Sequence, residues 1–380
     1  MSDSSRPPAA TGPRLSIVVV NYDGWPDVLG LTARLAREPE FLSGACRVVV
    51  VDNASPSPPA DADVLDRPGL RVVRRPDNGG FAVGVNAGWR ALPAPWLLLL
   101  NPDVDVPPGF LAGVLGRIAD YEARPEGPPG VVGFALHNED GSRQGSVGVF
   151  PSLLRAFREQ FVPRRRRKYV PGRRLRPGRI DWATGACLLI DGRLMAAAGG
   201  FDEDFFLYHE EVAFCRVATD LGFAVEYDPA LVATHRKPLQ DRPISPKMRV
   251  VVRHAKLLYF RKHRPRGEFL ALAAIVALEA AVRGAWAMLL GRDVERRAWR
   301  EVAATARGLR RGGGPLGREV IERAERATAE RASLGAATRD DDGRRSRPRT
   351  TKADQHGSRR DAYTNGLPTS RGKPDREAVR

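Results

Sequence analysis

The first hundred residues alternate between short apolar runs and stretches with helical spacing. Four runs, each bounded by turn-forming residues, predict buried strands over Leu15–Asn21, Arg47–Asp52, Leu70–Arg74 and Trp96–Leu100. Between them, apolar residues at helical spacing predict helices over Pro26–Arg37 and Phe81–Leu92. Strands that alternate with helices in this way predict an α/β fold with a mostly parallel central sheet.

The second half of the chain mixes the two patterns. Short apolar runs predict strands over Val131–Leu136, Ala186–Ile190 and Ala224–Tyr227. Helical spacing predicts helices within Phe201–Leu221, over Lys247–Arg264 and over Phe269–Leu290. Residues 335–380 are polar and poor in apolar side chains, so we expect them to be disordered.

Composition excludes wholesale disorder and suggests a compartment. Hydrophobic residues make up 42% of the chain, which is enough for a core. There are 3 cysteines, and the residues before Leu15 are polar rather than a secretory leader. We therefore expect a reducing, cytoplasmic setting.

The net charge of +16 is concentrated in a few segments. Residues 163–179, an expected mobile loop, carry nine Arg or Lys and no acid, and residues 236–268 carry eleven against two. Such segments suit an anionic surface, either nucleic acid or phospholipid. No helix-turn-helix, zinc-finger or RNA-recognition signature is present, so we favour a membrane surface and expect no nucleic-acid partner.

The apolar segment Phe269–Leu290 bears on the same question. It is long enough to span a bilayer, but Glu279 and Arg283 near its middle make a simple span costly. A helix lying in the membrane interface is the favoured interpretation, and a soluble helix that covers the α/β domain is the alternative.

Polar side chains follow the predicted strands at their carboxyl ends, where parallel sheets bind ligands. The segments are Asn21-Tyr22-Asp23, Asp52-Asn53 and Asn101-Pro102-Asp103, with Asp105 close behind. A strand that opens into such carboxylates suits a metal–diphosphate site, although a plain turn would use the same residues. Transfer from a nucleotide sugar needs such a cation, a general base for the acceptor hydroxyl and a nucleoside pocket.

Several motifs extend this pattern in a fixed order. They are Asp52-Asn53-Ala54-Ser55, the glycine-rich run from Asn78 to Gly88, Trp182–Ala186, Gly199–Glu203 and Tyr208–Glu211. Together with LLLNPDV they make the chain resemble the family-2 inverting glycosyltransferases of the GT-A fold, and within them the rhamnosyltransferase-like branch. The resemblance covers Leu15 to about His235 and continues more weakly to about Arg264.

The resemblance implies a nucleotide-sugar site. Tyr22 would pack on the nucleobase, and Asp52 would accept a hydrogen bond from the ring NH of uracil or thymine. The remaining members of this site would be Asn78, Gly80, Asn86 and Asn101. For each of these residues ordinary turn or cap chemistry is the structural alternative.

The resemblance also implies the reacting groups. Asp103 and the late His235 would hold Mg²⁺ or Mn²⁺, while Asp105 falls outside the family register. Glu211 would be the catalytic base beside Glu210, at a position where the family usually has Asp, and Ala213 replaces another frequent acid. The acceptor side would be lined by Trp182, Gly185 and Asp202, with Trp182 equally suited to a core.

The sequence thus predicts an inverting, metal-dependent glycosyltransferase of cell-envelope polysaccharide synthesis, with dTDP-rhamnose as the favoured donor and UDP sugars as other candidates. Its acceptor would be a saccharide, free or linked to polyprenyl diphosphate, at the cytoplasmic face of the membrane. The expected organisation is a disordered segment over 1–13, a catalytic domain over 14–240, a helical membrane-surface region over 241–334 and a tail over 335–380.

Three alternatives remain. A galactosyl or galactofuranosyl transferase would share these motifs, and a non-catalytic sugar-nucleotide or glycan-binding scaffold would share the fold. A nucleotide-dependent oxidoreductase would need a glycine-rich turn after the first strand, where this chain has Asn21-Tyr22-Asp23-Gly24.

Overall fold

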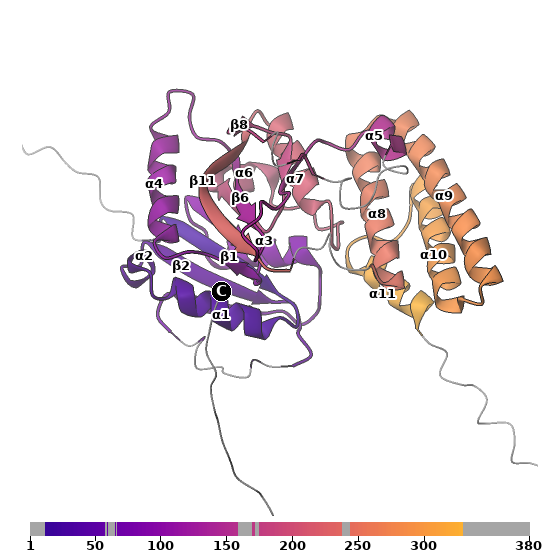
Figure 1. The fold of residues 1–380 in the computed structure, drawn as a ribbon, viewed down its shortest axis with the longest axis horizontal. Coiled ribbons are helices and arrows are strands. Elements are labelled where there is room, and N and C mark those ends of the chain that lie inside the picture. The colour runs from indigo at the N-terminus through magenta and orange to yellow at the C-terminus, as the bar shows by residue number, and fades with distance from the viewer. Residues whose placement is uncertain are drawn as a thin grey trace, which may run out of the picture. The chain divides into compact units, whose positions relative to one another are not determined.

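The computed structural model describes residues 12–57, 59, 65, 67–158, 169–171, 175–237 and 244–329. The described residues belong to one compact unit that contains both the sheet and the C-terminal helices (Figure 1). The predictions for residues 1–11 and for the tail 335–380 lie outside the described residues, as do most of the basic segment 163–179 and the proposed boundary at residue 240.

A mixed sheet of nine strands forms the centre of the molecule, in the order β3-β2-β1-β4-β10-β6-β11-β5, with β8 paired to β11. Strands β3, β2, β1 and β4 run parallel to one another, as do β6 and β11, whereas β10 runs antiparallel between β4 and β6. The expected α/β fold with a mostly parallel central sheet is therefore confirmed. The strands are β1 (Leu15–Asn21), β2 (Cys46–Asp52), β3 (Leu70–Arg74), β4 (Trp96–Leu100), β5 (Val104–Asp105), β6 (Val131–His137), β8 (Gly178–Arg179), β10 (Cys187–Asp191) and β11 (Val225–His235). A separate pair consists of β7 (Val147–Gly148) and β9 (Trp182–Ala183).

Helices cover both faces of this sheet. The helices associated with it are α1 (Trp25–Leu35), α2 (Pro39–Leu42), α3 (Phe81–Ala91), α4 (Phe110–Glu122), α6 (Gly192–Ala198) and α7 (Glu210–Asp220). A further short helix, α5 (Leu153–Arg158), packs against α9 (Arg266–Leu289). Alternate residues of β1 enter different clusters: Ile17 packs with α1 and α4, and Val18 packs with α3 and α7. Because both faces are buried, the strands consist of continuous apolar runs, as the sequence indicated.

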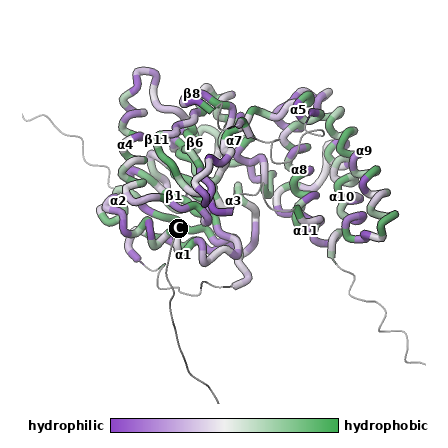
Figure 2. Tube along the Cα trace, viewed as in Figure 1, coloured by the Kyte–Doolittle hydropathy of each residue, from purple (hydrophilic) through white to green (hydrophobic). Residues whose placement is uncertain are grey.

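Four further helices pack together and against α7. They are α8 (Pro246–His263), α9 (Arg266–Leu289), α10 (Asp293–Arg310) and α11 (Arg318–Thr328). Among the described helices, α9 alone is long and apolar enough to cross a membrane by length and composition. Figure 2 shows hydrophobic residues recurring along α9.

The structure corrects several sequence expectations in the second half. The predicted strand Ala224–Tyr227 continues to His235, which places that histidine on β11 rather than in a following loop. Gly178 and Arg179, expected in a mobile loop, pair with β11. Helices α4, α10 and α11 were not predicted, although their buried residues recur at helical spacing.

Helix α3 lies unusually close to the sheet because two of its residues lack side chains. A Cβ atom on Gly84 would lie 2.6 Å from Val20, and one on Gly88 would lie 2.6 Å from Val18. The glycines thus allow the glycine-rich run to approach β1, which brings the start of α3 near the polar ends of the strands.

We expect Gly88→Ala to lower the free energy of unfolding by about 1–3 kcal/mol, because the added methyl group overpacks the contact with β1. Gly116→Ala is the matched control: Gly116 is exposed on α4 with nothing near its Cβ position, so the same change should raise stability by about 0.5–1 kcal/mol. Urea denaturation of both variants measures the difference, and equal effects would contradict the close approach.

Candidate active site

The ends of β1 and β2 form a polar corner. Asn21 lies beside Asp52 in the parallel register, and its Nδ2 donates to Asp52 Oδ1 at 3.2 Å. Ser55 donates to the same oxygen through its hydroxyl at 2.5 Å and its backbone N–H at 3.3 Å. Asp52 is buried, whereas the adjacent Tyr22 is 57% exposed. A fixed carboxylate beside an exposed aromatic ring can bind a flat heterocycle that offers an N–H.

Strained backbone accompanies this corner. Asp23 has φ +57° and Ala54 has φ +58°, a region that residues other than glycine seldom adopt. The hydrogen bond from Gly24 N–H to Asn21 Oδ1 at 3.0 Å and that from Asp23 N–H to Ser55 Oγ at 2.8 Å hold the two turns. Such strain is typical of functional turns that the surrounding structure holds in place.

The glycine-rich run joins this corner through Asn53, whose Nδ2 donates to Gly80 O at 2.9 Å. Asn78 Oδ1 accepts from Gly80 N–H at 3.1 Å and thereby closes the turn before α3. Gly80 has φ +95°, and a Cβ atom there would lie 2.2 Å from the carbonyl oxygen of Phe206. The loop therefore contacts the segment 199–209, which leads into α7.

Asn86 of α3 is hydrogen-bonded to the segment 199–209. Its amide donates to Phe201 O at 2.8 Å and to Glu203 Oε1 at 2.9 Å, and it accepts from Phe201 N–H at 2.8 Å. The side chain is buried and its amide hydrogens are both engaged. Asn86 therefore ties α3 to the segment 199–209.

Asp103 and His235 meet although they are far apart in sequence. His235 ends β11 beside β5, and its Nε2 lies 3.3 Å from Asp103 Oδ1. Gln144 fixes the imidazole: its Oε1 lies 2.7 Å from His235 Nδ1, while its Nε2 donates to His235 O and to Asn138 Oδ1. This orientation of the amide assigns a proton to Nδ1 and leaves Nε2 as the ring nitrogen that faces the carboxylate.

Two facing electron-pair donors suit a cation. Neighbouring ligands of an octahedral ion with bonds of about 2.1 Å lie about 3.0 Å apart, close to the observed separation. Within the described part of the chain no group of three His, Cys, Asp or Glu side chains gathers at one point. Asp103 and His235 thus fit an ion that takes its remaining ligands from water and from a diphosphate, as Mg²⁺ and Mn²⁺ do.

Asp105 does not belong to this pair. It forms ion pairs with Arg34 and, at 3.1 Å, with Arg236. Two guanidinium groups balance its charge, which makes it a poor metal ligand. The structure therefore separates the two acids that the sequence placed two residues apart.

Glu210 and Glu211 begin α7, directly after a left-handed turn. Tyr208 has φ +72° and His209 has φ +66°, so the chain turns sharply before the helix. Both glutamates are 5% exposed. A Cβ atom on Gly185 would lie 3.8 Å from that of Glu211, and the next residue, Ala186, accepts from Asn101 N–H at 2.9 Å. Gly185 therefore lies between α7 and the end of β4.

Trp182 and Asp202, which the resemblance places on the acceptor side, both have partners within the chain. Trp182 is buried, donates from its indole N–H to Val149 O at 3.0 Å and packs against Gly148, so it is a core tryptophan. Asp202 accepts from Lys262 Nζ at 2.6 Å. The sequence left the core interpretation of Trp182 open, and burial decides in its favour.

Lys262 of α8 anchors the segment that precedes the glutamates. It also bonds Asp204, whose backbone oxygen accepts from Gly317 N–H at 2.8 Å. Burial by itself lowers the pKa of Lys262, but the hydrogen bonds to the two aspartates outweigh it and raise the pKa above its usual value. Neither Lys262 nor Gln144 follows from a sequence pattern, because each acts on a segment more than fifty residues away.

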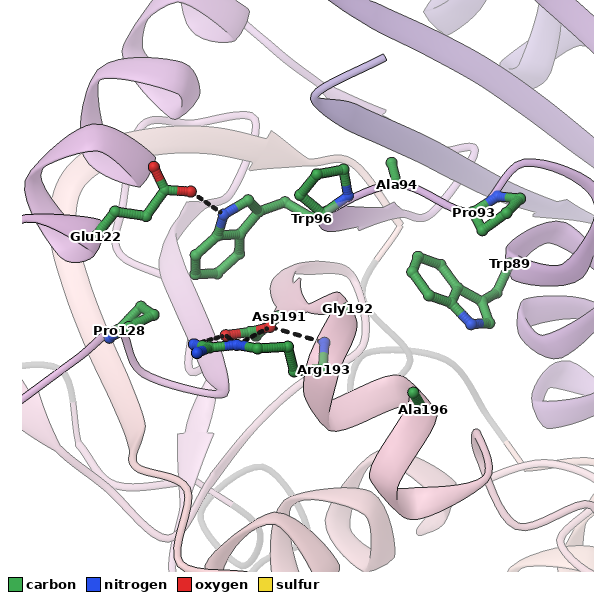
Figure 3. Close-up of a pocket in the computed structure, with 11 residues that line it drawn as sticks. Trp89, Pro93, Ala94, Trp96, Glu122, Pro128, Asp191, Gly192, Arg193 and Ala196 are labelled. Atoms are coloured by element: carbon green, nitrogen blue, oxygen red, sulfur yellow. Dashed lines mark hydrogen bonds and ion pairs between the residues drawn. The ribbon is translucent and has the colours of Figure 1, made fainter. Parts of the chain in front are cut away.

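A cavity of about 690 Å³ lies elsewhere. Figure 3 shows Trp96, Asp191 and Arg193 on its wall, with Arg193 bonded to Asp191. Trp96 begins β4, whereas Asn101 follows its end, so this cavity lies at the opposite edge of the sheet from the strand ends described above. The titratable groups of the candidate site are not part of it.

The chain is similar to known glycosyltransferases. The model of the family described as "Glycosyl transferase family 2" matches residues 16–173. An N-acetylglucosaminyl-diphospho-decaprenol L-rhamnosyltransferase of Mycobacterium tuberculosis is 27% identical over 245 residues, 59% of this chain and 76% of the relative. A low-salt glycan biosynthesis hexosyltransferase, Agl10, of Haloferax volcanii is 25% identical over 236 residues, 60% of this chain and 68% of the relative. Among solved structures, GalNAc-T7 with UDP, GalNAc and Mn²⁺ aligns with a TM-score of 0.46 and 16% identity, over 67% of this chain and 51% of that one.

We expect Lys262→Met to loosen the segment 199–209, because Asp202 and Asp204 lose their common cation and then repel each other. Backbone amides of this segment should exchange hydrogen about fivefold faster. This rate change corresponds to a decrease of roughly 1 kcal/mol in the free energy of local opening, as expected for a part-exposed ion-pair network. Lys247→Met is the control on the same helix, since Lys247 pairs only with Glu325 on α11 among the described residues. Unchanged exchange in Lys262→Met, measured by mass spectrometry, would show that the anchor is dispensable.

Proposed function

Because the chain belongs to the family-2 glycosyltransferases, we propose that it transfers a sugar, with rhamnose favoured, from a nucleoside diphosphate to a lipid-linked saccharide in cell-envelope glycan synthesis. One observation carries the proposal. A fixed carboxylate, a metal-suited Asp–His pair and a pair of buried glutamates lie on segments that are joined to one another by contacts through Asn53, Gly80 and Gly185.

The donor would enter between the ends of β1 and β2. Tyr22 packs on the base, and Asp52 accepts its ring N–H, which favours uracil or thymine over adenine. Asn78 and Gly80 shape the turn before α3, where the small residue lets the backbone approach phosphate. Asn101 lies beside the diphosphate.

Asp103 and His235 would hold Mg²⁺ or Mn²⁺, with Gln144 orienting the imidazole. When bound, such an ion neutralises charge that develops on the departing diphosphate. Arg34 and Arg236 keep Asp105 away from this role.

Glu211 would remove the proton from the acceptor hydroxyl. The oxygen then attacks the anomeric carbon on the face opposite the diphosphate, so the configuration inverts in one step. Glu210 and the turn at His209 position Glu211, while Gly185 leaves room beside it for the acceptor. Lys262 bonds Asp202 and so holds the segment 199–209, which we propose to contact the acceptor.

The acceptor class is supported by the relatives and by charge. The M. tuberculosis relative is named for an acceptor carried on decaprenyl diphosphate. This chain carries the basic segments 163–179 and 236–268, which suit a diphosphate or an anionic leaflet. We therefore propose a polyprenyl-diphosphate-linked saccharide at the cytoplasmic face of the membrane.

Replacement of Glu211 by Gln should reduce turnover of the preferred donor by about 10²- to 10⁴-fold, because the base is lost while the shape is kept. Donor affinity, measured by calorimetry or saturation-transfer NMR across dTDP and UDP sugars, should stay within a factor of three. Glu126→Gln, at an exposed position in the turn after α4, is the control. Full turnover in Glu211→Gln would reject the base, and absence of turnover with every donor in the unmodified protein would favour a binding scaffold.

Asp103→Asn should weaken activation by Mg²⁺ or Mn²⁺ at least tenfold, because one of the two protein ligands loses its charge. Asp105→Asn removes an equal charge two residues away and should leave the metal titration unchanged, since Asp105 pairs with arginines. The measurement is donor hydrolysis against metal concentration after chelation. Equal responses from the two variants would contradict the assignment.

A further inference from the structure

The outer face of α9 is an apolar surface with no described segment covering it. Its inner face packs into the core through Phe269, Leu272, Ala273, Val276 and Ala280. Opposite these positions, large side chains are open to solvent: Leu278 is 66%, Val282 62%, Trp286 63% and Leu289 74% exposed. A soluble protein rarely leaves such a continuous stripe uncovered unless it binds something.

The inner face of α9 argues against a membrane span. Glu279 pairs with Arg253 of α8 at 2.7 Å and with Arg283 at 3.1 Å. Arg249, Arg253 and Arg283 surround the buried ring of Trp299 on α10 at 5.1, 5.1 and 5.6 Å. Crossing a bilayer would either break these contacts or place several charges in hydrocarbon.

The positive charge next to the exposed apolar face of α9 indicates which kind of partner covers that face. Residues 281–311 contain eight arginines and three acids, a net charge of +5. Within the described residues, Arg292, Arg300 and Arg307 form no ion pair, and all three are exposed. A second copy of the chain would bring arginine-rich surfaces against each other, whereas an anionic bilayer offers both apolar tails and opposite charge.

We propose that the α9–α10 hairpin docks on an anionic lipid bilayer, with Leu278, Val282, Trp286 and Leu289 entering the headgroup–acyl boundary and the arginines contacting lipid phosphates. The proposal deepens the lipid-linked acceptor of the proposed function and rests on it for its biological purpose. Helix α8 packs against this hairpin and bonds the segment 199–209 through Lys262. Docking would therefore hold the segment 199–209 at a fixed distance from the membrane.

Trp286 provides a direct probe. Four of the other five tryptophans, Trp25, Trp96, Trp182 and Trp299, are at most 4% exposed, and Trp89 is half-buried. Binding of the full-length protein to phosphatidylglycerol-containing vesicles should shift the tryptophan fluorescence emission to shorter wavelength. Lipids with brominated acyl chains should quench this fluorescence. Trp286→Phe should abolish both changes. Phosphatidylcholine vesicles should bind far more weakly.

Matched variants distinguish vesicle binding by the α9–α10 hairpin from a general effect of the protein's net charge. Arg300→Glu with Arg307→Glu should lower the partition coefficient by at least roughly thirtyfold, since each basic residue contributes on the order of a fivefold affinity at an anionic surface. Arg37→Glu with Arg47→Glu makes the same charge change on the α/β side. Leu278→Glu with Leu289→Glu should abolish binding, whereas Leu42→Glu, at an exposed leucine of α2, should not.

Vesicle binding that persists in the hairpin variants, or that leaves Trp286 unquenched, would overturn the proposal in favour of another basic segment. A concentration-dependent dimer in light scattering, lost in Leu278→Glu with Leu289→Glu, would identify a second copy as the occupant and would also overturn it. Metal-dependent donor hydrolysis is measured on the same samples without lipid. Hydrolysis without docking rejects this inference alone, whereas docking without hydrolysis rejects the proposed function.

Discussion

The parallel register of β1, β2 and β4 is the constraint on which the candidate site depends. These strands are buried on both faces, so each backbone N–H and C=O must find its partner in the neighbouring strand. In the register that satisfies them, Asn21 lies beside Asp52 and Val19 beside Leu100. A shift by one residue would turn every side chain to the other face and separate the polar residues that follow the strands.

The antiparallel strand β10 adds what the parallel strands cannot supply. It returns the chain between β4 and β6, so that Ala186 bonds Asn101 and Gly185 lies against Glu211. The segment 199–209 is then held by α3 through Asn86, by the loop at Gly80 and by α8 through Lys262. These contacts sustain the left-handed turn before α7, whose strain would otherwise relax.

The C-terminal helices therefore do more than cover the core. Arginines and a glutamate on their inner faces pack around Trp299, and Lys262 of α8 holds the segment 199–209 through Asp202. Their outer residues leave α9 apolar and α10 cationic. The groups proposed for chemistry and the surface proposed for lipid thus belong to a single compact unit.

The sequence by itself determined the elements whose patterns are local. Continuous apolar runs predicted β1, β2, β3 and β4 almost to the residue, and turn residues after them located the binding edge. The family motifs identified Asp103, Glu211 and His235 as candidate site residues. They did not identify the residues that contact these three, because those contacts join segments distant in sequence. Only the tertiary structure showed that Asp103 faces His235 while Asp105 pairs with arginines, and that Trp182 is a core residue. It also showed the hydrogen bonds of Asn86 and the contacts made by Gln144 and Lys262. The physical reason is that hydrogen bonds, ion pairs and burial are set by packing between elements, whereas periodicity reports only which face of one element is apolar.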